Sequence, residues 1–474
     1  MNFSSMAKKI ISISIALILI ILNSTIIFAQ ESTGNPIYIV QPGENLTEIA
    51  EKFNVGVQEI ISINGIIDSN LISAGTELII PGLQGVSGRL ITSPVQVGET
   101  LPIILRKNKI SLENFLKINK ITSPSEIFVG TNLILPDINI NKNNSNNSLV
   151  ISEDTSIFSQ ALINRLNRWY LEKYNSGISP IKLPGEAFYY FSEDSSNFAS
   201  PFSPYIQKVE LSPLPIVQGH TAVIKVYSML PVNLTGTLNN KELQFFPDKT
   251  GQLFYALDGI YALAELGLVP LELNGEFENG DSFKIDQMVL LSSGGYVKET
   301  LTVESTLIAE ELNIEESQKI QNLLEPVSNE KLWTGLFRYP VDGSLSDHTI
   351  EFSSYFGNRR SYNNGQYSGF HGGLDFYVVL NTLNIYAPAP GTVIYSGPMD
   401  IRGLTTFIDH GQGVVSGYAH QSEILVEVGQ NVETGQLIGL IGKTGRVTGP
   451  HLHWDIWVNG NQVDPFDWVN NQYP

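Results

Sequence analysis

The sequence contains no cysteine among its 474 residues, which excludes a disulfide framework and a thiolate metal site. Any metal ion must therefore be held by histidine, aspartate or glutamate. Positive charge is also scarce, because 28 lysine and arginine residues face 47 acidic ones and leave a net charge of −19. So acidic a chain is a poor nucleic-acid binder, and it cannot hold an anionic polymer by charge alone. The 42% hydrophobic content and 16% charged content are typical of folded domains rather than disorder.

Histidine is scarce and unevenly placed, since five of the seven histidines lie in the last quarter: His371, His410, His420, His451 and His453. Two spacings stand out, an H-x-x-x-D from His371 to Asp375 and an H-x-H from His451 to His453. Strand residues two apart share a face, and residues four apart share one in a strand or a helix. Imidazole and carboxylate groups so arranged are typical zinc ligands, although residue types alone do not separate His451 from His453. The alternative is a set of ordinary surface histidines near turns.

The residues around these histidines extend the pattern from 356 to 470. The matching stretches are FGNRR at 356–360, HGGLDF at 371–376, APAPGTV at 387–393, IDHGQGVVSGYAH at 408–420, VGQNVETGQLIGLIGKTG at 428–445 and TGPHLHWDIWVNG at 448–460. In their order and spacing they resemble the lysostaphin-type zinc metallopeptidases, the peptidase M23 family. That resemblance implies a small antiparallel β-barrel or sandwich that cleaves peptide bonds in bacterial peptidoglycan.

The resemblance also implies roles for particular residues. It assigns His371, Asp375 and His453 as Zn²⁺ ligands, and His420 and His451 as catalytic residues that handle protons or stabilise the oxyanion. His410 is expected to be structural, at a turn, and His348 is left without a role. Asp455 stands where the family usually has glutamate, a difference expected to matter little.

Near the N-terminus one pattern occurs twice, at 38–81 and 93–136, with an offset of 55 residues and no insertion. A repeat of this length without an insertion or deletion indicates one fold used twice. Each copy reads as strand, helix, helix, strand, and resembles the LysM module, which binds the N-acetylglucosamine glycan of peptidoglycan or chitin. The second copy is divergent, because Asn108 stands where the first has Phe53 and Pro102 lies in its first helix. Glycan binding is expected of the first copy and left open for the second.

The remaining segments predict an extracytoplasmic, multidomain chain. Lys8 and Lys9 followed by an apolar run to Ala29 predict a signal peptide over 1–29, with an uncleaved membrane anchor as the alternative. The other predicted parts are LysM modules at 37–82 and 92–137, a polar linker at 138–150, a helix plus immunoglobulin-like β-sandwich at 151–302, an acidic connector helix with a solvated face at 303–334 and the metallopeptidase domain at 335–474. The fold class is thus mainly β, with two small α/β modules.

Together these features predict a secreted zinc metalloendopeptidase that hydrolyses peptide cross-links or stem peptides of peptidoglycan and is targeted to the wall by LysM. One alternative is a non-enzymatic wall-binding protein that activates another hydrolase. Another is a protease that acts on proteins. The intact set of His371, Asp375, His420, His451 and His453 favours the enzyme over the activator.

Overall fold

The computed structural model describes residues 35–68, 72–83, 85–86, 88–108, 110–121, 123–137, 146–151, 156, 159–160, 187–192, 202–203, 205–301, 310–346, 348–362, 367–377 and 382–474. The predicted signal peptide at 1–29 and nearly all of the helix predicted at the start of segment 151–302 lie outside these residues. Within the described ranges, no helix combines the length and the apolar character needed to cross a bilayer. The chain forms two compact units, whose boundary runs through the second repeat.

The two repeats have the predicted order of strand, helix, helix, strand. The first consists of β1 (Ile37–Ile39), α2 (Leu46–Phe53), α3 (Val57–Asn64) and β2 (Glu77–Ile79). The second consists of β3 (Arg89–Pro94), α4 (Leu101–Lys107), α5 (Leu112–Asn119), the 3₁₀ helix η1 (Pro124–Glu126) and β4 (Asn132–Pro136). Their strands form one sheet in the order β2-β1-β3-β4, in which β1 and β3 are parallel.

The same residues close each repeat at the same positions. The side-chain amide of Asn64 bonds to the backbone N–H and carbonyl of Ile79, at 2.7 and 2.9 Å. Asn119 repeats both bonds with Ile134 at the same distances. Helix α2 begins at a capping box made by Asn45 and satisfies its first free N–H groups in that way. Sequence identity at matched positions therefore reflects matched local structure.

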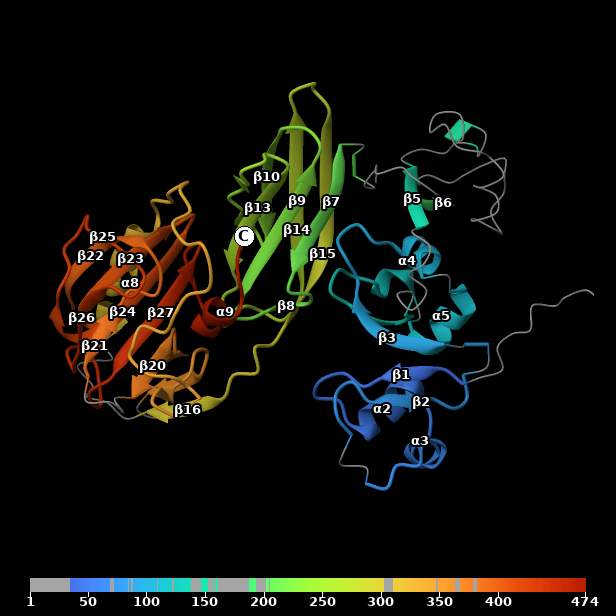
Figure 1. Cartoon of the computed structure of the whole chain (residues 1–474), viewed down its shortest axis with the longest axis horizontal. Coiled ribbons are helices and arrows are strands. Elements are labelled where there is room, and N and C mark those ends of the chain that lie inside the picture. The colour runs from blue at the N-terminus through green and yellow to red at the C-terminus, as the bar shows by residue number, and fades with distance from the viewer. Residues whose placement is uncertain are drawn as a thin grey trace, which may run out of the picture. The chain divides into compact units, whose positions relative to one another are not determined.

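Residues 205–301 contain the predicted β-sandwich, whose long strands are drawn in green in Figure 1. One sheet has the order β11-β10-β14-β15-β8 and the other β12-β13-β9-β7. The strands are β7 (Ile206–Ser212), β8 (Ile216–Val217), β9 (Thr221–Ser228), β10 (Val232–Leu238), β11 (Lys241–Glu242), β12 (Phe246–Pro247), β13 (Leu253–Gly259), β14 (Gly267–Phe277) and β15 (Ser282–Ser292). Alternating buried residues of both sheets form one apolar core.

The C-terminal domain is built on a larger, mostly antiparallel sheet in the order β17-β20-β27-β24-β23-β22-β25, extended by β21, β26 and β28. Its strands are β17 (Glu351–Ser354), β20 (Leu374–Tyr377), β21 (Asn384–Tyr386), β22 (Gly391–Met399), β23 (Gly403–Gly411), β24 (Val414–Ile424), β25 (Asn431–Val432), β26 (Leu437–Ile441), β27 (Leu452–Val458) and β28 (Asn461–Val463). The short helix α9 (Pro465–Asn470) ends the domain and packs its Trp468 against Trp333 and Phe337.

Two segments differ from the prediction. Residues 146–150, expected in a polar linker, belong to β5 (Asn146–Ile151), which pairs with β6 (Ala187–Ser192). Strand β16 (Lys298–Leu301), expected in the sandwich domain, pairs with β18 (Arg359–Tyr362), which in turn pairs with β19 (Tyr367–Phe370). The strand that such a segment pairs with depends on residues far away in the sequence, and a local sequence pattern does not predict that partner.

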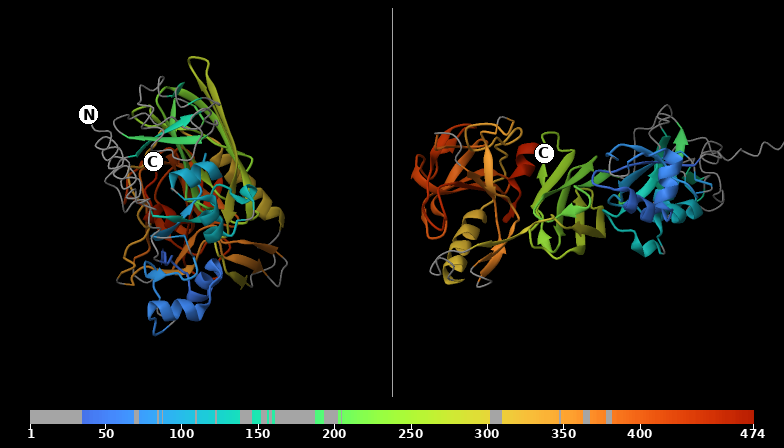
Figure 2. Two further views of the ribbon diagram at one scale, coloured as in Figure 1. Left: turned by 90° about the vertical axis from the view of Figure 1, so that its right-hand side faces the viewer. Right: turned by 90° about the horizontal axis from the view of Figure 1, so that it is seen from below.

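The expected solvated face of the acidic connector helix is also wrong at one position. Helix α8 (Glu310–Leu324) packs Ile320 and Leu324 against Phe407 and Trp457 of the C-terminal sheet, and Figure 2 shows it beside these strands. Glu316 is only 7% exposed, because its carboxylate accepts hydrogen bonds from two backbone N–H groups of the 400–402 turn. Helix α8 is therefore part of the C-terminal domain rather than a free connector.

Candidate active site

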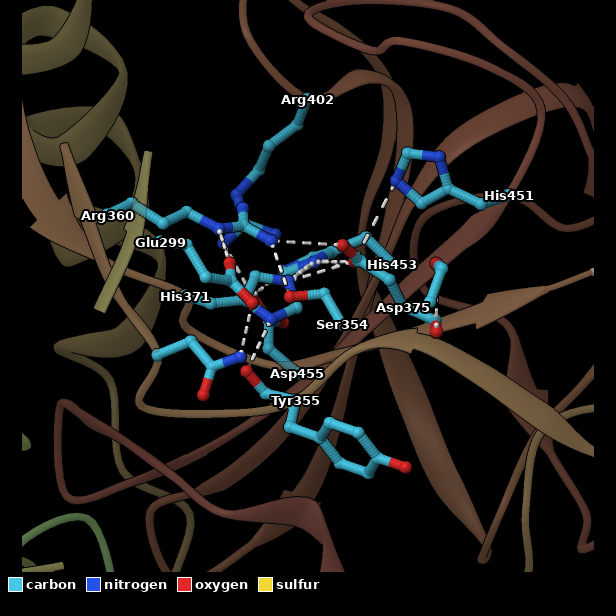
Figure 3. Close-up of polar contacts among 12 residues, drawn as sticks. Glu299, Ser354, Tyr355, Arg360, His371, Asp375, Arg402, His451, His453 and Asp455 are labelled. Atoms are coloured by element: carbon cyan, nitrogen blue, oxygen red, sulfur yellow. Dashed lines mark hydrogen bonds and ion pairs between the residues drawn. The ribbon is translucent and has the colours of Figure 1, made fainter. Parts of the chain in front are cut away.

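Three predicted ligands meet where strands β20 and β27 lie side by side. Asp375 and His453 are direct partners in the antiparallel register of these strands, and His371 lies just before β20. Asp375 Oδ1 lies 2.9 Å from His371 Nε2 and 2.7 Å from His453 Nδ1. The two imidazole nitrogens are 3.0 Å apart. Figure 3 shows the three side chains converging on one point. These three donor atoms are a group that could hold a metal ion.

Glycine permits this close approach of the two strands. A Cβ at Gly373 would lie 2.2 Å from the carbonyl oxygen of Trp454, closer than nonbonded atoms come. Glycine at 373 is therefore needed so that β20 can reach β27. The close approach of the strands places Asp375 opposite His453.

The outward nitrogens of both imidazoles are held by acceptors, which orients their lone pairs toward the Asp375 carboxylate. His371 Nδ1 lies 2.8 Å from the carbonyl oxygen of Tyr355, an acceptor that requires the proton on Nδ1. His453 Nε2 faces Asp455 Oδ2 at 3.5 Å. In this tautomeric state His371 Nε2 and His453 Nδ1 carry lone pairs, as metal-binding histidines do. Three electron-rich atoms aimed at one point fit a cation.

The electrostatic field at this point is negative. Burial opposes ionisation of Asp375, but contacts with His371 and His453 hold the pKa of its carboxyl well below the usual range. Burial likewise lowers the pKa of His453, yet hydrogen bonds to Asp375 and Asp455 outweigh burial and raise that pKa. A field that favours a proton on His453 also favours a metal cation among the three groups. The donor set of two imidazoles and one carboxylate matches the ligands zinc takes in hydrolases.

His420 and His451 lie beside this cluster and carry an available nitrogen each. Their ring centroids are 4.9 Å apart. His420 Nδ1 lies 2.9 Å from the carbonyl oxygen of Thr444, and His451 Nδ1 lies 2.9 Å from that of Gly449. Since a carbonyl can only accept, both Nδ1 atoms carry the proton and both Nε2 atoms carry a lone pair. Burial and the neighbouring His453 and His451 lower the pKa of His420 to about 3, so this ring stays neutral.

His451 and His453, which residue type could not separate, occupy different positions. His451 Nε2 lies 3.7 Å from Asp375 Oδ1, a full ångström farther than His453 Nδ1. The ring of His453 is the one that completes the cluster with His371.

Two other histidines, His410 and His220, lie outside the cluster. His410, expected at a turn, lies within strand β23 and is fully buried, with Nδ1 2.7 Å from the carbonyl oxygen of Pro390 and Nε2 2.7 Å from Ser416 Oγ. His220 lies in a turn of the sandwich and contacts Asp467 of α9 at 2.8 Å. Both therefore hold structure together.

Comparison with known proteins identifies the parts of the chain. Residues 369–465 match the model of peptidase family M23, and residues 38–81 and 95–136 match the LysM domain. The chain carries an M23 peptidase domain and two LysM domains. The M23 domain contains the cluster of His371, Asp375 and His453 described above.

Several named proteins are similar to this chain over the M23 domain. The peptidoglycan DD-endopeptidase ShyA of Vibrio cholerae is 39% identical over 127 residues, which is 27% of this chain and 28% of that protein. The DD-carboxypeptidase/endopeptidase Mpg of Neisseria meningitidis is 39% identical over 95 residues, 20% of this chain and 22% of that protein. The chain thus matches less than a third of the length of these relatives. A crystal structure from Pseudomonas aeruginosa described as peptidase M23 is 27% identical, covers 53% of this chain and 94% of that one, and has a TM-score of 0.38.

Asp455 of the M23 domain contacts His453 of the cluster, although the replacement of the usual glutamate by aspartate is expected to matter little. Its side chain is fully buried, accepts a 2.5 Å hydrogen bond from Arg402 Nη2 and a 3.0 Å bond from Gln462, and faces His453. Burial opposes ionisation, but the Arg402 guanidinium holds the pKa of Asp455 well below its usual range. Asp455 lies two residues after His453 on one strand, so the same-face rule could have found it.

A second charged pair reaches the cluster from β18. Arg360 donates to Asp375 Oδ2 at 3.2 Å and to Ser354 Oγ at 2.9 Å. Glu299 of β16 accepts a 2.5 Å bond from Asn358 and lies 3.5 Å from Arg360 Nε. Arg360 stands in the FGNRR stretch, which offered a signal, but Glu299 lies outside the matched region and no local pattern pointed to it.

These groups line a cavity of about 740 Å³ that contains His371, Asp375, His420, His451 and His453. Its wall also includes residues that precede 335, among them Glu299 and Thr300 of β16 and Asn313, Glu316 and Ser317 of α8. The cavity therefore depends on segments outside the part of the chain that the M23 family model matches.

Proposed function

We propose that the chain is an extracytoplasmic zinc metalloendopeptidase that hydrolyses peptide bonds of bacterial peptidoglycan and is held to the wall by LysM. The observation that carries the proposal is the convergence of His371, Asp375 and His453 within an M23 peptidase domain. The DD-endopeptidase and DD-carboxypeptidase/endopeptidase names of two relatives support a peptide bond of peptidoglycan as the substrate. The LysM domains support a glycan partner, and the acidic charge gives no support for nucleic acid.

Zinc would be held by His371 Nε2, Asp375 Oδ1 and His453 Nδ1. When bound, zinc supplies a Lewis acid that polarises the scissile carbonyl and lowers the pKa of water. Tyr355 and Asp455 hold the outer nitrogens of the two ligating rings, so each ring presents a lone pair. The chain therefore has the ligands and the groups that orient them.

The chain's own proton-handling groups are His420 and His451. Each holds its Nδ1 proton on a backbone carbonyl, which leaves Nε2 free to take a proton from the attacking water and return one to the leaving amine. The pKa of about 3 at His420 makes it a weak base, so its neutral ring is suited to accept a hydrogen bond at Nε2 and thereby orient the water. His451, which is 16% exposed at its side chain, is the candidate general base.

Location outside the cytoplasm follows from the proposed substrate. The basic residues Lys8 and Lys9 and the apolar run up to Ala29 support a secretory signal over 1–29. Export by this route would bring both LysM domains and the M23 domain to the wall.

Purified sacculi digested with the chain test the proposal. We expect new amino and carboxyl termini on released muropeptides, measured by liquid chromatography and mass spectrometry, and none with Asp375→Ala. The identity of those termini names the bond that is cut. Intact glycan and peptide after digestion with zinc-loaded chain would contradict the enzyme and favour the wall-binding activator. Cleavage of casein but not of sacculi would instead indicate a protease of proteins.

A further inference from the structure

The second LysM repeat holds the edge of the β-sandwich with two of its loops. The N–H of Gly98, in the loop after β3, donates to the side-chain oxygen of Gln287 at 2.8 Å. The N–H of Val129, in the loop before β4, donates to the carbonyl of Met288 at 3.2 Å. The carbonyl of Val129 in turn accepts from Leu290 at 2.8 Å. Strand β15 therefore bonds to both loops through Gln287, Met288 and Leu290.

The same contact is apolar and closely packed. Val97 and Val129 are 8% and 2% exposed, and both belong to the hydrophobic core of the sandwich. A Cβ at Gly130 would lie 3.0 Å from Pro215 Cα, so only glycine lets this loop approach so closely. Side chains of one domain that complete the core of another indicate a fixed junction rather than a passing contact.

The first repeat forms the same two loops with the same backbone. Gly75 donates its N–H to Val40 at 2.8 Å, and Gly130 donates to Val95 at 2.9 Å. The φ angles of the two glycines are +85° and +88°. The loops of the two repeats therefore have the same backbone conformation, and a difference between them must come from their side chains and their contacts.

The two loops are exposed in the first repeat and buried in the second. Four residues of the first repeat are exposed where their partners 55 residues later are buried: Pro42, Gly43, Ala74 and Gly75. A Cβ at Gly75 would meet nothing within 4 Å. Val97 and Val129 replace Pro42 and Ala74, which adds the apolar surface that the sandwich buries.

We propose that the second LysM repeat is an internal docking module, which binds the β-sandwich through a loop face formed by Val97, Gly98, Val129 and Gly130. The first repeat, whose equivalent loop face is exposed, then provides the retention on the wall polymer. The inference deepens the proposed function, since the second part rests on wall binding by LysM. The first part, docking to β15, stands without it.

Hydrogen exchange on the full chain tests the docking. The amide protons of Val129 and Leu290, which bond across the junction, should exchange as slowly as those in the strands of the sandwich core. Val97→Glu places a charge in the junction and should speed exchange at both amides by about tenfold or more. Pro42→Glu, the matched substitution in the first repeat, should leave both unchanged. Because Val97→Glu can impair folding, Gln287→Ala serves as a second, milder variant.

Fast exchange at Val129 and Leu290 in the unsubstituted chain overturns the docking. So does unchanged exchange in both Val97→Glu and Gln287→Ala.

Pull-down on purified peptidoglycan tests the division of labour. Pro42→Glu should lower retention of the full chain by about tenfold, whereas Val97→Glu should keep or raise it. An equal loss in both variants, or no change in either, overturns the division of labour. A chain that is not retained even without substitution contradicts the proposed wall binding, and exchange at Val129 and Leu290 still decides the docking.

Discussion

Arg360 and Asp375 are joined by a hydrogen bond of 3.2 Å to Oδ2, the carboxylate oxygen that points away from the ligand cluster. The other oxygen, Oδ1, faces His371 and His453. One carboxylate thus has one oxygen for the proposed metal and one for the guanidinium. Because Glu299 of β16 lies 3.5 Å from Arg360 Nε, a strand outside the matched family region contributes to the position of a proposed ligand.

Substitution of Arg360 should weaken zinc binding. Arg360→Ala frees Asp375 to rotate, so we expect a loss of about 10- to 100-fold in zinc affinity, measured by competition with a chromophoric chelator. Arg359→Ala is the matched control, since Arg359 is the preceding residue of β18 and its side chain is exposed. Equal zinc affinity in the two variants would show that Arg360 does not position Asp375.

The five active-site residues should divide into two groups. His371→Ala, Asp375→Ala and His453→Ala each leave two ligands, so bound zinc and activity should fall together. His420→Ala and His451→Ala should keep near-stoichiometric zinc and lose about 10²- to 10⁴-fold in rate. Metal content by mass spectrometry beside turnover on sacculi measures both. Zinc lost in His451→Ala but kept in His453→Ala would reverse the ligand assignment.

Asp455 should tune zinc affinity through His453. Asp455→Asn removes the negative charge beside the His453 ring and leaves Arg402 with only the more distant Glu316 carboxylate, so zinc affinity and thermal stability should both decrease. Gln462→Ala removes a neutral donor from the same carboxylate oxygen and should have a smaller effect on both. If Gln462→Ala weakens zinc binding as much as Asp455→Asn, the charge of Asp455 is not what matters.

His410 should make the M23 domain sensitive to acid. Burial lowers its pKa to about 4, so the folded state holds the ring neutral while the unfolded state protonates near pH 6.5. Stability is then complete above pH 6.5 and falls as the pH drops toward 4, by about 3 kcal/mol for this group. Denaturant unfolding across this pH range measures the loss. His410→Gln, which cannot protonate, should flatten the curve, whereas an unchanged slope would assign the acid sensitivity to other groups.

The sequence by itself determined the repeats, the predominance of β structure and the identities of the cluster residues. The 55-residue offset fixed both LysM folds, because local caps and turns such as Asn64 and Asn119 recur with the same bonds. The family pattern around HGGLDF and HLH predicts His371, Asp375 and His453 as ligands. Such features could be predicted because each depends on residues close in sequence or on a family pattern.

Tertiary structure alone decided which of these residues meet and what supports them. The register of β20 against β27 separated His453 from His451, a choice that residue types left open. The burial of Glu316 depends on α8 packing against the large C-terminal sheet, and the approach of Glu299 depends on β16 pairing with β18. The burial of Val129 likewise depends on a strand more than a hundred residues away. Local sequence patterns specify which side chains share a face of a strand or helix, whereas packing between distant segments decides which of these faces are buried.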